Sequence, residues 1–220
     1  MEEEKRMNHV AKLSDEAMRL NNNLWALATT NARVYPDNYE NLLIDTTLIA
    51  ETIACSLRHL TLDLGTVKRT LLLKKVSDSQ GITVDEDSGI FKIVFPSLLP
   101  KRKRRKSNEF LLDPLYYALD VYCKEHRPER FQRCVICFSH VYDRSYPLKR
   151  TRDYDNLEIK SVLDVIGSFL LTDDSGALCD IYHTTEVADT DCTKVSIMSP
   201  DQFPVWLERQ KGLKSISNFS

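Results

Sequence analysis

Four aspartates frame the stretch of this sequence that is best suited to carboxylate chemistry. Asp153 and Asp155 stand two residues apart, and Asp173 and Asp174 follow an apolar-periodic run of about four turns. Residues two apart in an extended segment point to the same side, so the first two carboxylates would form a pair. If the chain returns alongside them after that run, Asp174 would join the pair, and a divalent cation would relieve the repulsion. Mg²⁺ fits such a set, because it binds a few carboxylates together with water and phosphate oxygens.

A purely structural explanation of the same aspartates is also open. Asp is a favoured residue at helix starts, and either Asp155 or Asn156 could cap a helix predicted over residues 157–170. Asp-Asp-Ser-Gly, at residues 173–176, is a common turn sequence. The spacing of the carboxylates alone therefore leaves both explanations standing.

A strongly basic segment precedes the aspartates. Residues 101–152 contain 14 Lys and Arg against 6 Asp and Glu, and the rest of the chain is acidic enough to bring the net charge to −2. Such a segment can bind the phosphate backbone, form a solvated loop or act as a nuclear-localisation signal. Nucleic-acid contact is the favoured interpretation, through Lys101, Arg102, Lys103, Arg104, Arg105, Lys106, Arg150 and Arg152.

The acidic stretch resembles a family signature. Asp153-Tyr-Asp155-Asn156, Lys160, Asp164 and Asp173-Asp174 are similar to the signature of RusA-like endodeoxyribonucleases, small Holliday-junction resolvases of bacteria, phages and prophages. The resemblance covers about residues 90–200 and includes Pro96-Ser97 at the end of a strand. Lys160 lies one residue later than the lysine of the family.

The resemblance implies a fold, an activity and an assembly. Asp153, Asp155 and Asp174 would be the metal ligands of a Mg²⁺-dependent homodimer that cuts branched DNA, with Mn²⁺ as a possible substitute. Lys160 would stabilise charge, and Asp164 and Asp173 would support the ligands or cap helices. Such an enzyme would act in DNA recombination and repair. Two alternatives remain: a non-catalytic nucleic-acid-binding protein on the same fold, and a protein-interaction module.

The elements that must position these residues form an α+β domain with a small mixed sheet, expected over residues 70–200. Strands are predicted over residues 81–84 and 90–95 with a turn at 85–89, then over 134–142, 177–184 and 193–198. Asp113 and Pro114 are predicted to start a helix that ends before Pro128. Residues 201–220 are expected to form a C-terminal tail.

The first 66 residues predict a helical hairpin. Apolar or small residues recur every three or four positions from Val10 to Leu27 and again from Tyr39 to Leu64, with Pro36 between the two runs. Two helices of this length cannot bury their apolar stripes alone. The hairpin must pack on the rest of the chain, on its copy in a dimer, or on a protein partner.

The remaining features indicate a cytoplasmic protein that does not cross a membrane. No apolar run of about 18 residues occurs, the N-terminus has no apolar signal core, and six dispersed cysteines are expected to be reduced. Cys134 and Cys137 would point to opposite faces of a strand, so a metal or redox pair is not expected. Ordinary core or surface roles are expected for His59, His126, His140 and His183.

Overall fold

The computed structural model describes residues 2–65, 68–100, 109–145, 151, 153–173 and 175–217. The chain divides into two compact units, residues 1–71 and 72–220. The fold class is α+β, with a mixed five-stranded sheet in the second unit, as the sequence predicts.

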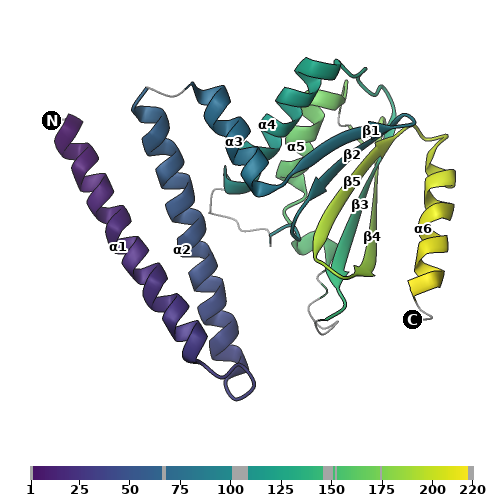
Figure 1. Ribbon diagram of the computed structural model, residues 1–220. Coiled ribbons are helices and arrows are strands. Elements are labelled where there is room, and N and C mark those ends of the chain that lie inside the picture. The colour runs from purple at the N-terminus through teal and green to yellow at the C-terminus, as the bar shows by residue number, and fades with distance from the viewer. Residues whose placement is uncertain are drawn as a thin grey trace. The chain divides into compact units, whose positions relative to one another are not determined.

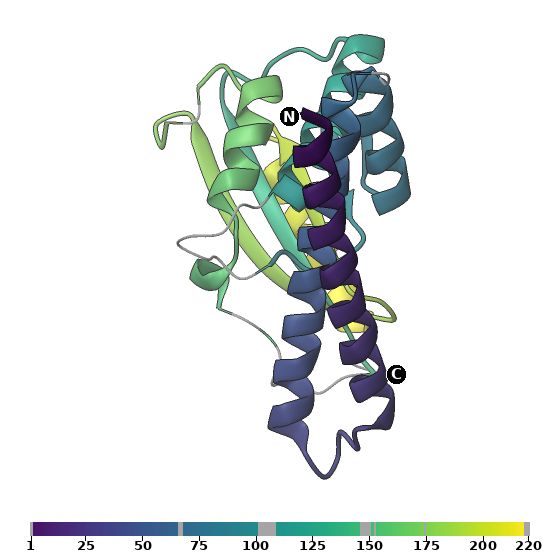
Figure 2. The same cartoon turned by 90° about the vertical axis from the view of Figure 1, so that its left-hand side faces the viewer.

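The first unit is an antiparallel helical hairpin (Figures 1 and 2). Helix α1 spans Glu2–Thr29 and α2 spans Pro36–Asp63. The turn between them is held by Asn31, whose Oδ1 accepts hydrogen bonds from the backbone N–H groups of Arg33 at 3.0 Å and Val34 at 3.3 Å. Pro36 suits the first turn of α2, where a backbone N–H has no helical partner anyway. The predicted hairpin is confirmed.

The boundary between the two units falls within a helix that the sequence does not predict. Helix α3 spans Arg69–Gln80, a segment whose sequence shows only a short apolar run at residues 71–73. Leu73 is completely buried and Leu71 is exposed. The buried side of this helix includes the polar Ser77 as well as Leu73, so the apolar periodicity that would predict the helix is weak.

The sheet has the strand order β1-β2-β5-β3-β4. Its strands are β1 (Thr83–Asp87), β2 (Ile90–Phe95), β3 (Cys134–Asp143), β4 (Cys179–Ala188) and β5 (Cys192–Met198). β3 and β4 are parallel, and the other pairs are antiparallel. The turn between β1 and β2 is only Ser88-Gly89, both at positive φ, so β1 runs later than predicted.

Helices cover both faces of the sheet (Figure 1). Helices α4 (Glu109–His126) and α5 (Lys160–Leu170) pack on one face, and α6 (Phe203–Ser217) packs on the other. Cys134 lies in the core under α4 and α5, whereas Cys137 lies in the cluster that holds Trp206 of α6. The two thiols therefore diverge as predicted. The expected C-terminal tail is largely helical.

The predicted start of α4 is wrong. Pro114 lies inside the helix, one turn after its first residue Glu109. Proline has no N–H, so the carbonyl of Phe110 loses its helical donor. Gln80 of α3 replaces it, because its Nε2 donates to the Phe110 carbonyl oxygen at 3.0 Å. A long-range side-chain bond of this kind has no local sequence signal.

Candidate functional site

The acidic motif follows the carboxyl end of β3, on the crossover that leads through α5 to the parallel strand β4. Asp153 is extended, and Tyr154–Asn156 form one turn of 3₁₀-helix. Leu157 is again extended and buried, so α5 starts at Lys160 rather than at residue 157. The predicted capping by Asp155 or Asn156 is wrong, and no side chain caps α5 through its N-cap residue Ile159.

Glu158 secures the junction between the turn and α5. Its carboxylate is buried and accepts a hydrogen bond from the Ser161 hydroxyl at 2.6 Å. Its backbone N–H donates to the carbonyl oxygen of Pro100 at 2.9 Å. The segment that carries the acidic motif is thus fixed at the point where it enters α5.

Tyr154 anchors the acidic turn to the sheet. Its ring is nearly parallel to those of His140 on β3, at 5.3 Å between centroids, and His183 on β4, at 4.9 Å. Its hydroxyl shares a 2.9 Å hydrogen bond with the hydroxyl of Thr185. Both ends of the Tyr154 side chain are therefore held by the sheet, and the turn is held with it.

The two histidines form a neutral pair beneath Tyr154. His140 Nε2 and His183 Nδ1 lie 3.5 Å apart, and their ring centroids are 5.7 Å apart with an interplanar angle of 13°. The centroid separation exceeds the N–N separation by about one ring width, so the rings meet edge to edge in one plane. One nitrogen must donate and the other accept, which excludes a doubly protonated pair in this geometry.

Burial keeps the pair uncharged. Burial lowers the pKa of His140 to about 4, with a smaller effect from the neighbouring His183. Burial also lowers the pKa of His183. Nδ1 of His140 is buried and has no hydrogen-bond partner among the described residues. A charged imidazolium would be poorly solvated here.

The sequence analysis missed this arrangement. Both histidines were expected to be ordinary residues on strands, and His140 does have the buried environment of a core residue. Their proximity depends on the register that pairs His140 with Thr185 and Phe138 with His183. The tyrosine inside the acidic motif was the one available signal, because an aromatic residue between two aspartates is well placed to hold the turn by its ring.

The carboxylates that flank Tyr154 remain accessible. Asp153 and Asp155 are both exposed. Lys160, predicted to stabilise charge, is exposed at the first position of α5, and Asp164 is exposed further along the same helix. The structure therefore holds the backbone of the turn firmly and leaves its two acidic side chains in water.

Asp173 lies at the opposite end of α5 from this pair. The eleven residues of α5 extend for about 16 Å. Beyond them, Leu171 bridges Phe131, which precedes β3, and Asp173 turns to accept a 3.0 Å hydrogen bond from the N–H of Ser175. Asp173 is thus well outside the reach of a cation shared with Asp153 and Asp155.

Several predicted residues lie outside the described part of the chain. They are Asp174, Arg150, Arg152 and the basic block Lys101, Arg102, Lys103, Arg104, Arg105 and Lys106. Among the described residues, no group of three His, Cys, Asp or Glu side chains is placed to hold a metal ion. Within the same residues, no helix is both long and apolar enough to cross a membrane.

Comparison with known proteins identifies a family. The model of a family of unknown function, DUF6100, matches residues 2–220. The chain belongs to this family. No curated protein matches the chain. Among solved structures, the periplasmic domain of Helicobacter pylori MotB is similar at 14% identity and a TM-score of 0.34, covering 64% of this chain and 91% of that one. A similarity of this strength carries no functional argument.

In this DUF6100 chain, the site combines a rigid backbone with free acidic groups. Ligands of open α/β sheets bind outside the carboxyl ends of the strands, which is where the crossover after β3 begins. Two exposed carboxylates on a fixed turn can bind a cation or a cationic group. His140 is completely buried and His183 is partly buried, so the pair is suited to supporting Tyr154 rather than to exchanging protons with a substrate.

Proposed function

We propose that this protein is a Mg²⁺-dependent endonuclease that acts on branched DNA such as four-way junctions. The observation that carries the proposal is the anchoring of Tyr154 on His140, His183 and Thr185. This anchoring gives Asp153 and Asp155 a fixed backbone while both remain exposed. Fixed, solvent-facing carboxylates are what a metal-assisted hydrolysis of phosphodiesters requires.

Asp153 and Asp155 fit a hard divalent cation by their chemistry. Mg²⁺ is commonly bound by one or two carboxylates, with water and substrate phosphates completing its shell, and Mn²⁺ accepts similar donors. Bound there, the cation would activate water and neutralise charge on the phosphate. Tyr154 would keep the two ligands in place, and Lys160 would compensate further negative charge. Asp174, the third expected ligand, lies outside the described residues.

The charge distribution of the sequence supports a DNA partner. The net charge of residues 101–152 is +8, and the predicted phosphate contacts at 101–106, 150 and 152 all precede the acidic motif, the last two directly. Electrostatic attraction of this kind gives salt-sensitive, sequence-independent affinity. A homodimer and a cytoplasmic location belong to the same proposal. All six cysteines are free thiols, as expected in a reducing compartment.

The test is cleavage of a labelled four-way junction beside a linear duplex of the same sequence, in Mg²⁺ and in Mn²⁺. The key variant is Asp155→Asn, and its matched control is Asp201→Asn, an exposed carboxylate on the other side of the fold near α6. We expect junction-selective cutting by the wild type and the control. The rate should fall by about 100-fold or more in the variant, because a metal ligand is lost.

A second function is favoured by the position of Asp173. Since Asp173 lies beyond the far end of α5, a three-carboxylate centre does not form from the described residues, and the fold could bind branched DNA without cutting it. Salt-sensitive binding without cleavage in either metal would establish this alternative. Cleavage that is equal in Asp155→Asn and wild type would refute the proposed role of the carboxylate pair. If the protein neither binds nor cleaves the junction, both DNA functions are refuted.

A further inference from the structure

The helical hairpin has almost no core of its own. Among its described side chains only Thr46 and Arg58, both on α2, are buried, and every buried apolar residue belongs to the second unit. Large apolar side chains are instead exposed, including Met18 at 61% and Trp25 at 68%. Helices of this kind gain most of their stability from packing, so an apolar face left in water indicates a missing partner.

Six exposed apolar residues follow a heptad repeat, three on each helix. One residue in every seven forms a line along each helix: Val10, Ala17 and Leu24 on α1, and Leu43, Ala50 and Leu57 on α2. Seven-residue spacing keeps side chains on one side of a helix and allows them to interlock with a neighbouring helix. The contact between α1 and α2 uses other residues, which include the half-buried Leu13 and Ile53.

The two lines lie on the same side of the hairpin. On each helix the exposed line is rotated by roughly 70° from the residues that face the other helix, at 100° per residue. The rotation has the same sense in both when each helix is viewed from its own N-terminus. Because α1 and α2 are antiparallel, both lines then emerge on one side. We call these six residues the heptad face.

The neighbours of the heptad face named here are uncharged, and the two on α2 have hydrogen-bond partners within the helix. Ser14 and Asn21 lie beside the line on α1, and Thr47 and Thr61 lie beside the line on α2. The hydroxyl of Thr47 donates to the carbonyl oxygen of Leu43 at 2.9 Å, and that of Thr61 donates to Leu57 at 2.8 Å. These threonines can be buried at little cost, since their polar atoms have partners within the helix.

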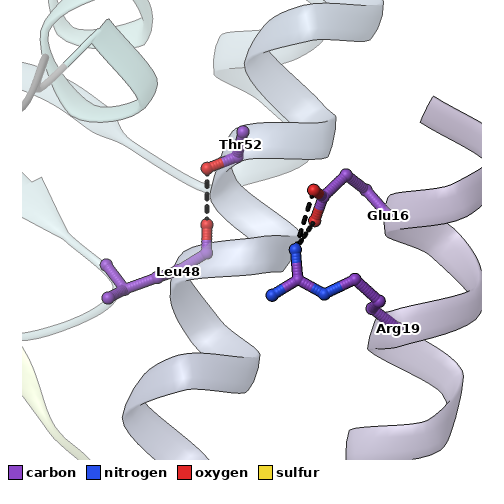
Figure 3. A network of polar contacts seen from close by, with 4 residues as sticks. All are labelled: Glu16, Arg19, Leu48 and Thr52. Atoms are coloured by element: carbon purple, nitrogen blue, oxygen red, sulfur yellow. Dashed lines mark hydrogen bonds and ion pairs between the residues drawn. The ribbon is translucent and has the colours of Figure 1, made fainter. Parts of the chain in front are cut away.

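The opposite side of the hairpin carries charge. Arg19 contacts both carboxylate oxygens of Glu16, at 2.8 and 3.0 Å (Figure 3). Glu16, His9 and Lys12 line a shallow groove with Thr52, whose hydroxyl donates to the Leu48 carbonyl at 2.7 Å in the same figure. The hairpin is therefore two-sided, with a charged side suited to water and an uncharged side suited to another protein surface.

The heptad face is complementary to itself. Residues 9–16 of α1 lie beside 52–56 of α2. At this register Val10 lies level with Leu57, Ala17 with Ala50, and Leu24 with Leu43. Along the face, a level of large side chains is followed by a level of alanines and then by another level of large side chains. The pattern is therefore symmetric about the alanine level. A two-fold axis through the alanine level would superpose the face on its own pattern and let two hairpins approach closely.

We infer that two copies of this chain associate through the heptad face to form a four-helix bundle. The face and its apolar flanks, Met18 and Trp25, extend over about 21 Å between Val10 and Leu24. Their exposed area is on the order of the 800 Å² per partner that a stable interface buries. The surface lies outside the residues that carry the nuclease resemblance, so it would form the proposed homodimer through the hairpin whether or not the chain cuts DNA.

The oligomeric state of the full chain tests the inference. Leu43→Glu and Ile44→Glu form a matched pair: the two residues are adjacent on α2 and are 47% and 44% exposed, but only Leu43 is on the heptad face. Ala50→Glu tests the centre of the face with a residue that favours helices. Mass would be measured by light scattering after gel filtration from roughly 1 to 100 μM, with helix content checked by circular dichroism.

We expect the wild type and Ile44→Glu to have about twice the chain mass of 25.4 kDa. Leu43→Glu and Ala50→Glu should keep their helix content and raise the dissociation constant at least 10-fold, because a charge is buried in the interface. A monomeric wild type would overturn the inference, and the heptad face would then belong to another protein. A dimer that tolerates both face variants, or one that Ile44→Glu disrupts equally, would also overturn it.

Discussion

Acidification should destabilise the second unit through His140. The imidazole is inaccessible to solvent, and burial lowers its pKa from the ordinary 6.5 to about 4. The unfolded chain therefore binds a proton at this site at a pH where the folded chain does not, and stability falls as the pH falls from about 6.5 toward 4. If the pH falls well below both pKa values, the free energy of unfolding decreases by at most about 3 kcal/mol. Between pH 7.5 and 5.0 it decreases by about 2 kcal/mol.

Urea unfolding at pH 7.5, 6.5, 5.5 and 5.0 would measure this loss. The buried Trp206 reports on the second unit, so the experiment is best done in a Trp25→Phe background that removes the signal of the hairpin. The variant His140→Phe keeps an aromatic ring under Tyr154 but cannot be protonated. We expect the wild type to lose about 2 kcal/mol more than this variant over the range.

The control and the refuting result are equally specific. His126→Gln, at the exposed end of α4, should follow the pH profile of the wild type. The reasoning fails if His140→Phe retains the full pH dependence of the wild type. It also fails if the ring of His140, followed by NMR in the folded protein, titrates at its ordinary pKa of 6.5. Either result would mean that the pair under Tyr154 accepts a proton without cost.

Three further predictions concern the scaffold. Gln80→Ala should destabilise the second unit by about 1 kcal/mol, because it removes the donor to the Phe110 carbonyl that Pro114 leaves without a helical partner. In a Pro114→Ala background the backbone N–H of residue 114 can donate instead, so the same substitution should cost almost nothing. A double-mutant cycle in urea measures this coupling. Gly89→Ala should lower the free energy of unfolding, measured by heat or urea, by about 1 kcal/mol or more. Its φ is 76°, and an added Cβ would lie 2.9 Å from Nε2 of Gln202. Gly176→Ala should lower it much less, because an added Cβ there meets no atom within 4 Å. Cys134, whose pKa burial raises to about 12, should resist alkylation at pH 8 until the protein unfolds, and rapid labelling of the native protein detected by mass spectrometry would contradict its burial.

The sequence predicts this fold where a local pattern determines the structure. The hairpin follows from apolar spacing and from Pro36. Strand β3 follows from its apolar run, and the divergence of Cys134 and Cys137 follows from the two-residue period of a strand. In each case the periodicity of neighbouring residues is enough, because the structure that results is local.

Local sequence patterns do not predict the structure where a distant residue decides it. Asp113-Pro114 has the composition of a helix start, but a donor from Gln80 allows the helix to begin earlier. Leu157 is predicted as helical from its spacing, but it is extended and buried, and Glu158 bonds to Pro100 and delays α5. Long-range bonds to single atoms leave no periodic signal, so these boundaries could not have been predicted from neighbours.

The parallel pairing of β3 and β4 explains why the candidate site differs from its sequence prediction. A parallel connection must return the chain to the start of the next strand, so α5 runs back along the sheet and separates Asp155 from Asp173 by its own length. The same pairing brings His183 beside His140 and creates the platform on which Tyr154 rests. One topological feature thus separates Asp173 from the pair that it was expected to support, and it provides the platform beneath Asp153 and Asp155. The metal site that we propose therefore depends first on the two carboxylates that flank Tyr154.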